Sequence, residues 1–334
     1  MKVAVLKETR AGERRVALVP QGVKALLKAG LEVTIQTGAG LASSVSDTEY
    51  REAGATIAAS APEALRDAGI VLAVHAPPPA DVAAMSEGTI LVSFLSPLTN
   101  PDLVRALAAS KITGIAMEMI PRITRAQSMD ALSSQSNLAG YRAMIEGAQI
   151  YGRAMPMMMT AAGTVAPAKV FVMGAGVAGL QACATAKRLG AVVEAYDVRP
   201  AAREQILSVG AKPVELDLDT GEAEGSGGYA KAQGEDFLKR QRELMTEVVK
   251  EMDVIVTTAA VPGAKSPILV TEDMVKAMKP GSIIVDLAAE RGGNCDLTES
   301  GKTVVKHGVT IIGPENVPSS VAFHASQMFG KNME

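Results

Sequence analysis

Cysteine, histidine and tryptophan are scarce in this chain, and their scarcity excludes several kinds of site. The 334 residues include two cysteines, three histidines and no tryptophan. Neither Cys183 nor Cys295 lies in a C-x-x-C motif, so no disulfide or metal ligand is indicated. Cys183 falls on the inner face of a predicted helix, which favours a reduced core thiol and a reducing cytosol.

Candidates for a catalytic acid or base are equally few. A dehydrogenase that oxidises an alcohol or an amine needs a general base, usually His or Lys, beside the nicotinamide. His75 ends an apolar run and is the one serious candidate, whereas His307 and His324 are expected to be surface or packing residues. The sequence contains no G-x-S-x-G, H-E-x-x-H or P-loop motif and no pair of carboxylates at catalytic spacing.

A strong charge of either sign is also missing. The net charge is −3 and charged residues make up 21% of the chain, which argues against a nucleic-acid partner. Residues 154–180 carry a single charge, yet they hold two prolines and four glycines and therefore do not predict a membrane-spanning helix. No signal peptide is visible, so we expect a cytoplasmic protein without a membrane span.

A dinucleotide-binding fingerprint occupies residues 169–188. The apolar run Val170–Met173 predicts a buried strand, three glycines follow in the spacing G-x-G-x-x-G, and an amphipathic helix comes next. Gly174 permits a tight turn, Gly176 lets the backbone approach a pyrophosphate, and Gly179 lets the helix pack against the strand. The start of the helix offers free N–H groups to the phosphates.

The second strand of this unit ends on Asp197, which predicts a preference for NAD(H). A carboxylate at that position accepts hydrogen bonds from both ribose hydroxyls and repels a 2′-phosphate. Arg199 is the discordant residue, because an arginine there could accept a 2′-phosphate.

Strand and helix patterns alternate along the whole chain, which predicts an α/β protein with parallel sheets covered on both faces. We expect two doubly wound Rossmann-like domains, joined by a long helix from about 131 to 154, with a cleft between them. The first domain comprises 1–130 with 309–334 and lacks a glycine fingerprint. The second comprises 131–308 and binds the nucleotide. The expected strands are Val3–Leu6, Val33–Gln36, Ile70–His75, Ile90–Leu95, Ile112–Met117, Lys212–Leu216, Val254–Thr257, Ile283–Leu287 and Thr303–Lys306.

Two further segments are less regular. Residues 217–237 are rich in glycine, which is typical of a solvated surface loop, although the length and the single aromatic Tyr229 also fit a mobile lid over a nucleotide. The methionines at 155 and 157–159 favour flexible core or interdomain packing.

The polar loop before the long helix, residues 122–136, is dense in amide, hydroxyl and charged groups. Ser128 or Asp130 is expected to cap the helix. Capping does not explain Arg122, Gln127 and Ser133 together. These side chains can hold a carboxamide and a pyrophosphate by hydrogen bonds, so we interpret them as positioning groups.

Several motifs resemble one known family. RAQSMDALSSQSNLAGYRA, VMGAGVAGLQA, GGYAK, VTTAAVPG and IVDLAAERGGNC are similar to the NAD(H)-binding component of proton-translocating nicotinamide nucleotide transhydrogenase, over residues 1–330. The resemblance implies hydride transfer from NADH to NADP⁺ on a separate NADP(H)-binding component, coupled to proton movement through a membrane component. It also implies a homodimer at the inner face of the membrane.

The resemblance assigns site residues in four groups. The nicotinamide-contacting loop comprises Arg122, Gln127, Asp130, Ala131, Leu132 and Ser133; the pyrophosphate turn comprises Gly174, Ala175, Gly176, Val177 and Gly179; the adenosine-ribose contacts are Asp197, Val198 and Arg199; and further contacts are Gly228, Tyr229, Gln241 and Ala260. Hydride transfer between two nicotinamides releases no proton, which agrees with the missing base.

Two other functions remain open. Alanine dehydrogenases share the fold and the opening VAVLKETRAGERRVALVP, with Arg15 as a candidate clamp for a substrate carboxylate. They carry a lysine where this chain has His75 and a catalytic histidine where it has Ser96, which counts against amino-acid oxidation. The third function is an NAD-sensing module without chemistry of its own.

Overall fold

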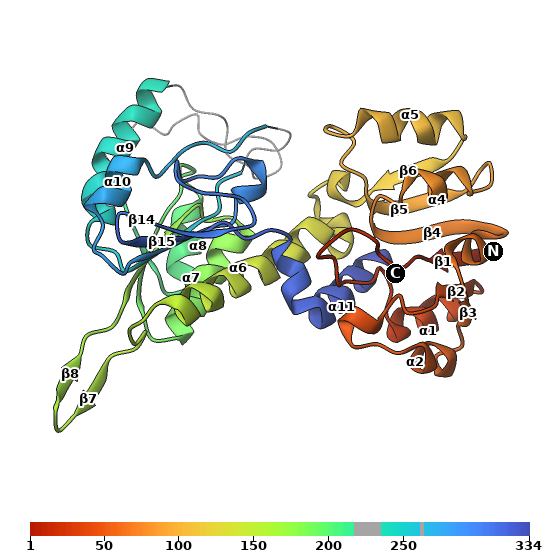
Figure 1. The fold of residues 1–334 in the computed structure, drawn as a ribbon, viewed down its shortest axis with the longest axis horizontal. Coiled ribbons are helices and arrows are strands. Elements are labelled where there is room, and N and C mark those ends of the chain that lie inside the picture. Colours follow the sequence, from red (N-terminus) through yellow and green to blue (C-terminus); the bar gives the residue numbers. More distant parts are fainter. Residues whose placement is uncertain (217–234, 261–263) are drawn as a thin grey trace. The chain divides into compact units, whose positions relative to one another are not determined.

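The chain divides into two units, each with its own sheet and core (Figure 1). The computed structural model describes residues 1–216, 235–260 and 264–334. The first unit comprises Met1–Gln135 with Pro318–Glu334, and the second comprises Ser136–Val317. The first boundary falls inside the long helix α6 (Ala131–Ile150), which the sequence predicted.

The first unit is built on a six-stranded parallel sheet with the order β3-β2-β1-β4-β5-β6. The order reverses between β1 and β4, as in a doubly wound fold. The register places Val3 opposite Val33 and Ile70. The strands are β1 (Lys2–Val5), β2 (Glu32–Gln36), β3 (Thr56–Ala58), β4 (Ala68–His75), β5 (Ile90–Phe94) and β6 (Thr113–Ala116).

Helices cover both faces of this sheet because alternate strand residues are buried on opposite sides. Val3 and Val5 belong to the core beneath α1 (Pro20–Lys28), α2 (Asp47–Glu52) and α11 (Ala322–Met333). Ala4 and Leu6 belong to the core beneath α3 (Ala61–Leu65), α4 (Pro79–Ala83) and α5 (Pro101–Ala109). Figure 1 shows α1 and α2 on one side of the sheet and α5 on the other. Short 3-10 helices are η1 (Leu41–Ser43), η2 (Met117–Met119), η3 (Thr124–Met129) and η6 (Val317–Val321).

The second unit has a seven-stranded sheet with the order β11-β10-β9-β12-β13-β15-β14. All neighbouring strands are parallel except β14 and β15. One face packs against α6, α7 (Val177–Arg188) and α8 (Ala202–Ser208), and the other against α9 (Glu235–Val249) and α10 (Glu272–Ala277). The predicted α/β class with two doubly wound sheets is confirmed. The other elements are β9 (Lys169–Met173), β10 (Val192–Tyr196), β11 (Lys212–Pro213), β12 (Val254–Thr257), β13 (Ile283–Asp286), η5 (Ala289–Arg291), β14 (Thr303–Lys306) and β15 (Val309–Ile312).

The structure differs from the prediction at residues 309–317, which we expected to return to the first domain. Strand β15 pairs with β13 and β14 in the second sheet. The reason is burial, since Val309 and Ile311 are fully enclosed in the core of the second unit. The terminal helix α11 does belong to the first unit, where Phe329 is fully buried.

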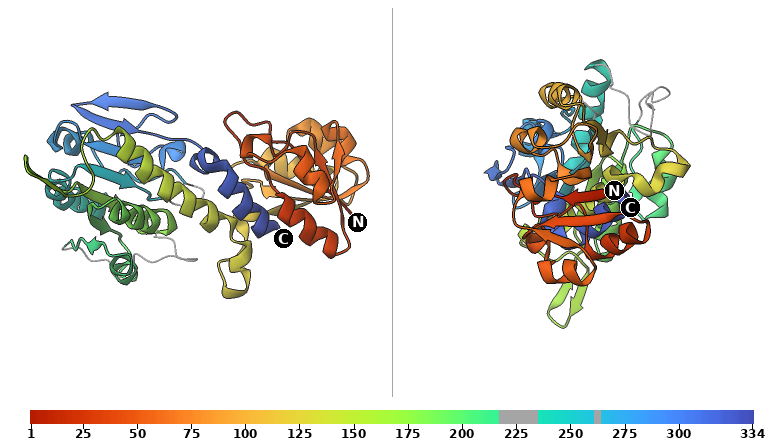
Figure 2. Two further views of the ribbon diagram at one scale, coloured as in Figure 1. Left: turned by 90° about the horizontal axis from the view of Figure 1, so that it is seen from below. Right: turned by 90° about the vertical axis from the view of Figure 1, so that its right-hand side faces the viewer.

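A β-hairpin replaces the packing that we expected for the methionine cluster. Strands β7 (Met158–Thr160) and β8 (Gly163–Val165) pair antiparallel and project from the second unit (Figure 1; Figure 2, right). Met155 lies in the core, whereas Met157, Met158 and Met159 are 60%, 44% and 77% exposed. The prediction of core packing is therefore wrong for three of the four methionines. Among the described residues, no helix is both long and apolar enough to cross a bilayer.

Candidate functional site

The three glycines of the fingerprint meet three different steric demands in the second unit. Gly174 directly follows β9 with φ +99°, and a Cβ there would lie 2.6 Å from Thr258 Oγ1. A Cβ on Gly179 would lie 1.8 Å from the Gly174 carbonyl oxygen, because α7 packs tightly against the turn. A Cβ on Gly176 would meet nothing within 4 Å. The turn is therefore closed on two sides and open at Gly176.

Helix α7 begins at this opening with its first N–H groups uncapped. Gly176 is the N-cap residue, provides no side-chain cap, and no acidic residue lies in the first turn. Lys187 and Arg188 occupy the last turn, where they complement the helix dipole. Uncapped N–H groups at a helix N-terminus bind anions. The residues present therefore fit the pyrophosphate of a dinucleotide.

The turn also lies where the strand order of the second sheet reverses, between β9 and β12. Thr258, the first residue after β12, donates its Oγ1 hydrogen bond to the Gly174 carbonyl oxygen at 2.9 Å. In open α/β sheets, ligands bind outside the carboxyl ends of the strands at such a reversal. Sequence reasoning missed Thr258, because 84 residues separate it from Gly174.

A buried amide holds the chain that follows Thr258. Asn294 accepts a hydrogen bond from Ala259 N at 3.0 Å and donates to the carbonyl oxygens of Ala259 and Pro267 at 2.9 and 2.8 Å. Asn294 N in turn donates to Asp286 at 2.7 Å, and both side chains are fully buried. The only sequence signal for this anchor is the carboxylate of Asp286 at the end of an otherwise apolar strand.

Asp197 lies at the end of β10, as predicted, but its carboxylate is already paired. Ala175 N donates to Asp197 Oδ2 at 2.8 Å. Arg199 donates from its backbone N and Nε to Oδ1, both at 2.9 Å, and from Nη2 to Oδ2 at 2.8 Å. The aspartate thus links the phosphate turn to the residue that the sequence marked as discordant.

The remaining predicted contacts of the second unit have different surroundings. Gln241 is buried on α9 and donates its amide hydrogen bond to Tyr196 Oη at 2.9 Å, so it supports the residue before Asp197. Val198 and Ala260 are half-buried. Gly228 and Tyr229 lie outside the described residues, as does most of the predicted lid, so their roles stay predictions.

In the first unit, three of the predicted loop residues form one network. Asp130 accepts hydrogen bonds from Ser133 N at 2.9 Å and Ser133 Oγ at 2.6 Å, and thereby caps the start of α6. Arg122 Nη2 donates to Ser133 Oγ at 3.1 Å, and its Nε lies 3.6 Å from Asp130 Oδ2. Ala131 is buried and Leu132 half-buried. Gln127 is exposed, and its side chain makes no hydrogen bond with any described residue.

The terminal helix fixes this loop from the other side. Asn332 on α11 donates to the Ser128 carbonyl oxygen and accepts from Ser134 Oγ, both at 2.7 Å. The sequence provided no signal for this contact, since Asn332 lies 204 residues beyond Ser128.

His75 belongs to a separate ionic cluster of the first unit. Its Nε2 lies 2.8 Å from Glu13 Oε2, and Glu13 also accepts from Arg15 Nη2 at 2.7 Å. Burial alone would raise the pKa of Glu13, but the hydrogen bonds from Arg15 and His75 hold that pKa well below its usual range. Arg15 is buried and also donates to Gln135 at 2.9 Å. The candidate carboxylate clamp is therefore engaged with groups of the chain itself.

Glu8 lies beside this cluster, where it accepts hydrogen bonds from Val74 N at 2.6 Å and His75 N at 3.4 Å. Burial raises the pKa of Glu8 to about 7 despite these hydrogen bonds. A cavity of about 590 Å³ opens here, lined by segments that follow β1 and β4, including Lys7, Arg10 and Pro77.

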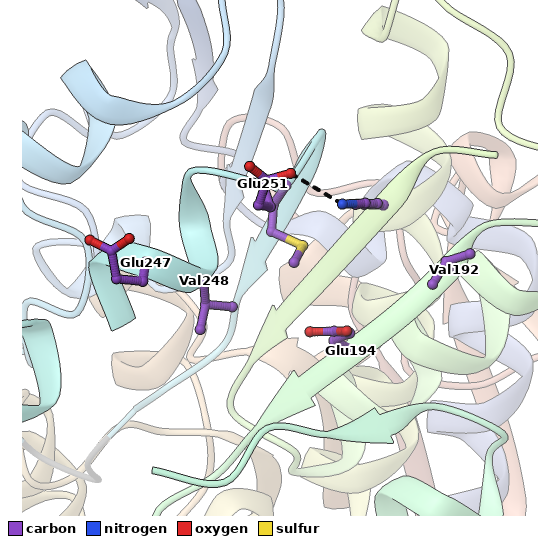
Figure 3. Close-up of a pocket in the computed structure, with 7 residues that line it drawn as sticks. Val192, Glu194, Glu247, Val248 and Glu251 are labelled. Carbon is purple, nitrogen blue, oxygen red and sulfur yellow. Dashed lines mark hydrogen bonds and ion pairs between the residues drawn. The ribbon is translucent and has the colours of Figure 1, made fainter. Parts of the chain in front are cut away.

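Another cavity, of about 250 Å³, lies at the opposite edge of the second sheet (Figure 3). It is lined by residues at the amino ends of β9 and β10 and by the end of α9, including Val192, Glu194 and Glu251. Lys169 Nζ donates to Glu251 at 3.2 Å (dashed line in Figure 3). Ligands of open α/β sheets bind at the carboxyl edge, so this cavity is not the candidate site.

Comparison with known proteins gives a consistent result for both units. Residues 4–139 match the N-terminal domain of the alanine dehydrogenase/PNT family, and residues 143–334 match its C-terminal domain. An NAD(P) transhydrogenase subunit alpha of Rhodospirillum rubrum is 55% identical over 339 residues, which cover 100% of this chain and 88% of that protein.

Other relatives extend the similarity to solved structures and to a second enzyme. The crystal structure of transhydrogenase from Sinorhizobium meliloti matches with a TM-score of 0.89 and 45% identity, covering 100% of this chain and 92% of that chain. Alanine dehydrogenase of Methanococcus maripaludis is 34% identical over 330 residues, which cover 96% of this chain and 82% of that protein.

Proposed function

Because the chain belongs to the alanine dehydrogenase/PNT family, we propose that it is the NAD(H)-binding component of a proton-translocating transhydrogenase. In this role it passes a hydride from NADH to NADP⁺ held by a partner protein. The resemblance that the motifs predicted is confirmed by the 55% identical relative. The hydride acceptor, the coupling to proton movement and the partners are the content of the proposal.

The glycine turn carries the proposal of NAD(H) binding. Open space at Gly176 lies next to the uncapped start of α7, at the reversal of strand order in the second sheet. A pyrophosphate bound there would accept hydrogen bonds from backbone N–H groups without displacing any side-chain cap. Asp197, at the end of the neighbouring strand, is the acceptor for the ribose hydroxyls.

The loop network of the first unit supports a positioning role. Bound NADH supplies the hydride from its nicotinamide ring. Arg122, Asp130 and Ser133 hold one another by hydrogen bonds and an ion pair, so the loop backbone around Gln127 is fixed. Transfer between two nicotinamides requires alignment to about 3–3.5 Å and no general base. A rigid polar loop without a catalytic base meets that requirement.

The partners in this proposal are an NADP(H)-binding component and a membrane component that conducts protons. The relative from Rhodospirillum rubrum is named as a subunit alpha, which supports membership of a complex made of several subunits. We further propose a homodimer on the cytoplasmic face of the membrane, attached through its partner subunits.

Alanine dehydrogenase activity is the second candidate, favoured by the 34% identity to such an enzyme. The ionic cluster speaks against it. Arg15 already donates to Glu13 and Gln135 and so is not directed at a substrate carboxylate. The same cluster contains His75 where the resemblance leads us to expect a lysine.

Reconstitution with an NADP(H)-binding partner tests the proposal. We expect the purified chain to bind NADH more tightly than NADPH, and the mixture to reduce an NADP⁺ analogue at the expense of NADH. Oxidation of NADH with pyruvate and ammonia, without a partner, would establish the dehydrogenase instead. NADH binding with no transfer to a competent partner would leave an NAD-sensing module.

A further inference from the structure

The carboxylate of Asp197 has no acceptor capacity left for a ribose. An ionised carboxylate offers about four lone-pair positions. Four donors among the described residues point at them: Ala175 N, Arg199 N, Arg199 Nε and Arg199 Nη2, at 2.8–2.9 Å. The side chains of Asp197 and Arg199 are only 7% and 14% exposed, so the pair is shielded from water and salt. Two of the four hydrogen bonds come from a guanidinium that can move.

We propose that Arg199 is a specificity-determining residue that competes with the ribose of NAD(H) for Asp197 and narrows the preference for NAD(H) over NADP(H). This inference rests on the proposed NAD(H) site. Binding of NADH requires the ribose hydroxyls to replace the Arg199 guanidinium on Asp197, so part of the binding free energy is spent on breaking the ion pair. The backbone hydrogen bonds from Ala175 and Arg199 remain in place.

The same displacement has the opposite effect on NADP(H). Asp197 repels a 2′-phosphate, but the displaced guanidinium lies within reach of that phosphate and can bind it through two parallel hydrogen bonds. Arg199 therefore weakens the binding of NADH and strengthens the binding of NADPH. Its removal should move the two affinities in opposite directions.

Opposite movement is the feature that separates this role from simpler ones. Both dinucleotides are anions, so loss of a positive charge alone would weaken both. Damage to the strand end would also weaken both. Only a residue that occupies the ribose acceptor and also serves the 2′-phosphate gives a gain for one ligand and a loss for the other.

The test measures the dissociation constants of NADH and NADPH with the purified chain, by fluorescence titration, for wild type and Arg199→Gln. We expect NADH to bind about threefold more tightly, since one partly shielded ion pair no longer has to be broken. We expect NADPH to bind about tenfold more weakly, since one charge-assisted hydrogen-bonding partner of the phosphate is lost.

Two further variants complete the test. Arg203→Gln removes the same charge from the neighbouring helix, where Arg203 pairs with Glu215 at 2.6 Å and the two side chains are 62% and 66% exposed; it should not widen the preference. Arg199→Lys keeps the charge but forms a single-point pair, and should give an intermediate result. Both affinities falling in Arg199→Gln, or NADH affinity falling in Arg199→Lys, would overturn the inference. Wild type that binds neither dinucleotide would instead contradict the proposed function.

Discussion

The Thr258 hydroxyl donates a hydrogen bond to the carbonyl oxygen of Gly174 at 2.9 Å and so joins the ends of the two strands at which the second sheet reverses its order. This bond crosses the point where the proposed site binds pyrophosphate. It fixes the start of the glycine turn to β12, whose following residue Ala259 is itself held by Asn294. The turn is thus anchored from the strand side as well as by its own glycines.

Loss of the Thr258 hydroxyl should weaken nucleotide binding. Thr258→Val keeps the shape of the side chain but removes the donor, so the Gly174 carbonyl loses a partner that contributes about 1 kcal/mol. We expect a few-fold loss of NADH affinity and a slightly lower urea midpoint. Thr246→Val is the matched control, because Thr246 bonds a carbonyl within α9. Equal NADH affinity in wild type and Thr258→Val would show that the turn does not depend on this bond.

The glycines of the turn should separate binding from stability. In Gly176→Ala the new methyl group meets no atom within 4 Å and φ is −76°, so we expect an unchanged melting temperature. NADH binding should weaken about tenfold or more, since the methyl group occupies the phosphate approach. In Gly179→Ala the Cβ would lie 1.8 Å from a backbone oxygen, and that clash should destabilise the fold by about 1–3 kcal/mol. Thermal melts and NADH titrations check both variants; a lowered melting temperature in Gly176→Ala would contradict the open turn.

These glycines were predictable from sequence because each requirement is local to one strand, one turn and one helix. Thr258, Asn294 and Asn332 were not, since each acts on backbone atoms that are distant in the sequence. The alternation of strands and helices likewise predicted both sheets. It did not reveal that Val309–Ile312 completes the second sheet, because a short apolar strand carries no record of its neighbour. Nor did it predict that Met157–Met159 lie on an exposed hairpin, since apolar residues alone indicate burial.

Glu8 should make stability depend on pH. Burial raises its pKa to about 7, whereas in the unfolded chain it titrates near the model-compound value of about 4.3. The folded state therefore holds a proton that the unfolded state has lost, and the Glu8 contribution to stability falls as pH rises from about 4.5 to about 7. Glu13, whose pKa is lowered, stays ionised in the folded state over this window. Urea midpoints between about pH 5 and 8 should fall more steeply in wild type than in Glu8→Gln; parallel pH profiles would contradict this.

The two cysteines should be unreactive in the folded chain. Burial raises the pKa of Cys183 to about 12 and that of Cys295 to about 11, so thiolate is scarce at about pH 8 and both sulfurs are shielded. Ellman's reagent should titrate almost no thiol in buffer and both thiols in concentrated urea. Rapid modification of one thiol in buffer would show that its surroundings open.

Gln127 and Asp130 should give contrasting kinetic effects, because one is exposed and the other holds the loop together. Gln127 makes no side-chain hydrogen bond among the described residues, so Gln127→Asn should leave the melting temperature and the NADH affinity nearly unchanged. If its amide positions the nicotinamide, hydride transfer to a partner-bound NADP⁺ analogue should slow about tenfold or more, because transfer is sensitive to small misplacements.

Asp130→Asn removes the charge that pairs with Arg122 and weakens the cap that Asp130 provides to Ser133 N. Loss of such a cap costs about 1 kcal/mol, so this variant should lower the melting temperature as well as the transfer rate. Single-turnover transfer, NADH titration and thermal melts on both variants separate the two roles. A large loss of NADH affinity in Gln127→Asn would assign Gln127 to binding, and an unchanged transfer rate would remove it from the site. The two variants therefore test whether alignment alone, in a loop without a general base, accounts for the proposed reaction.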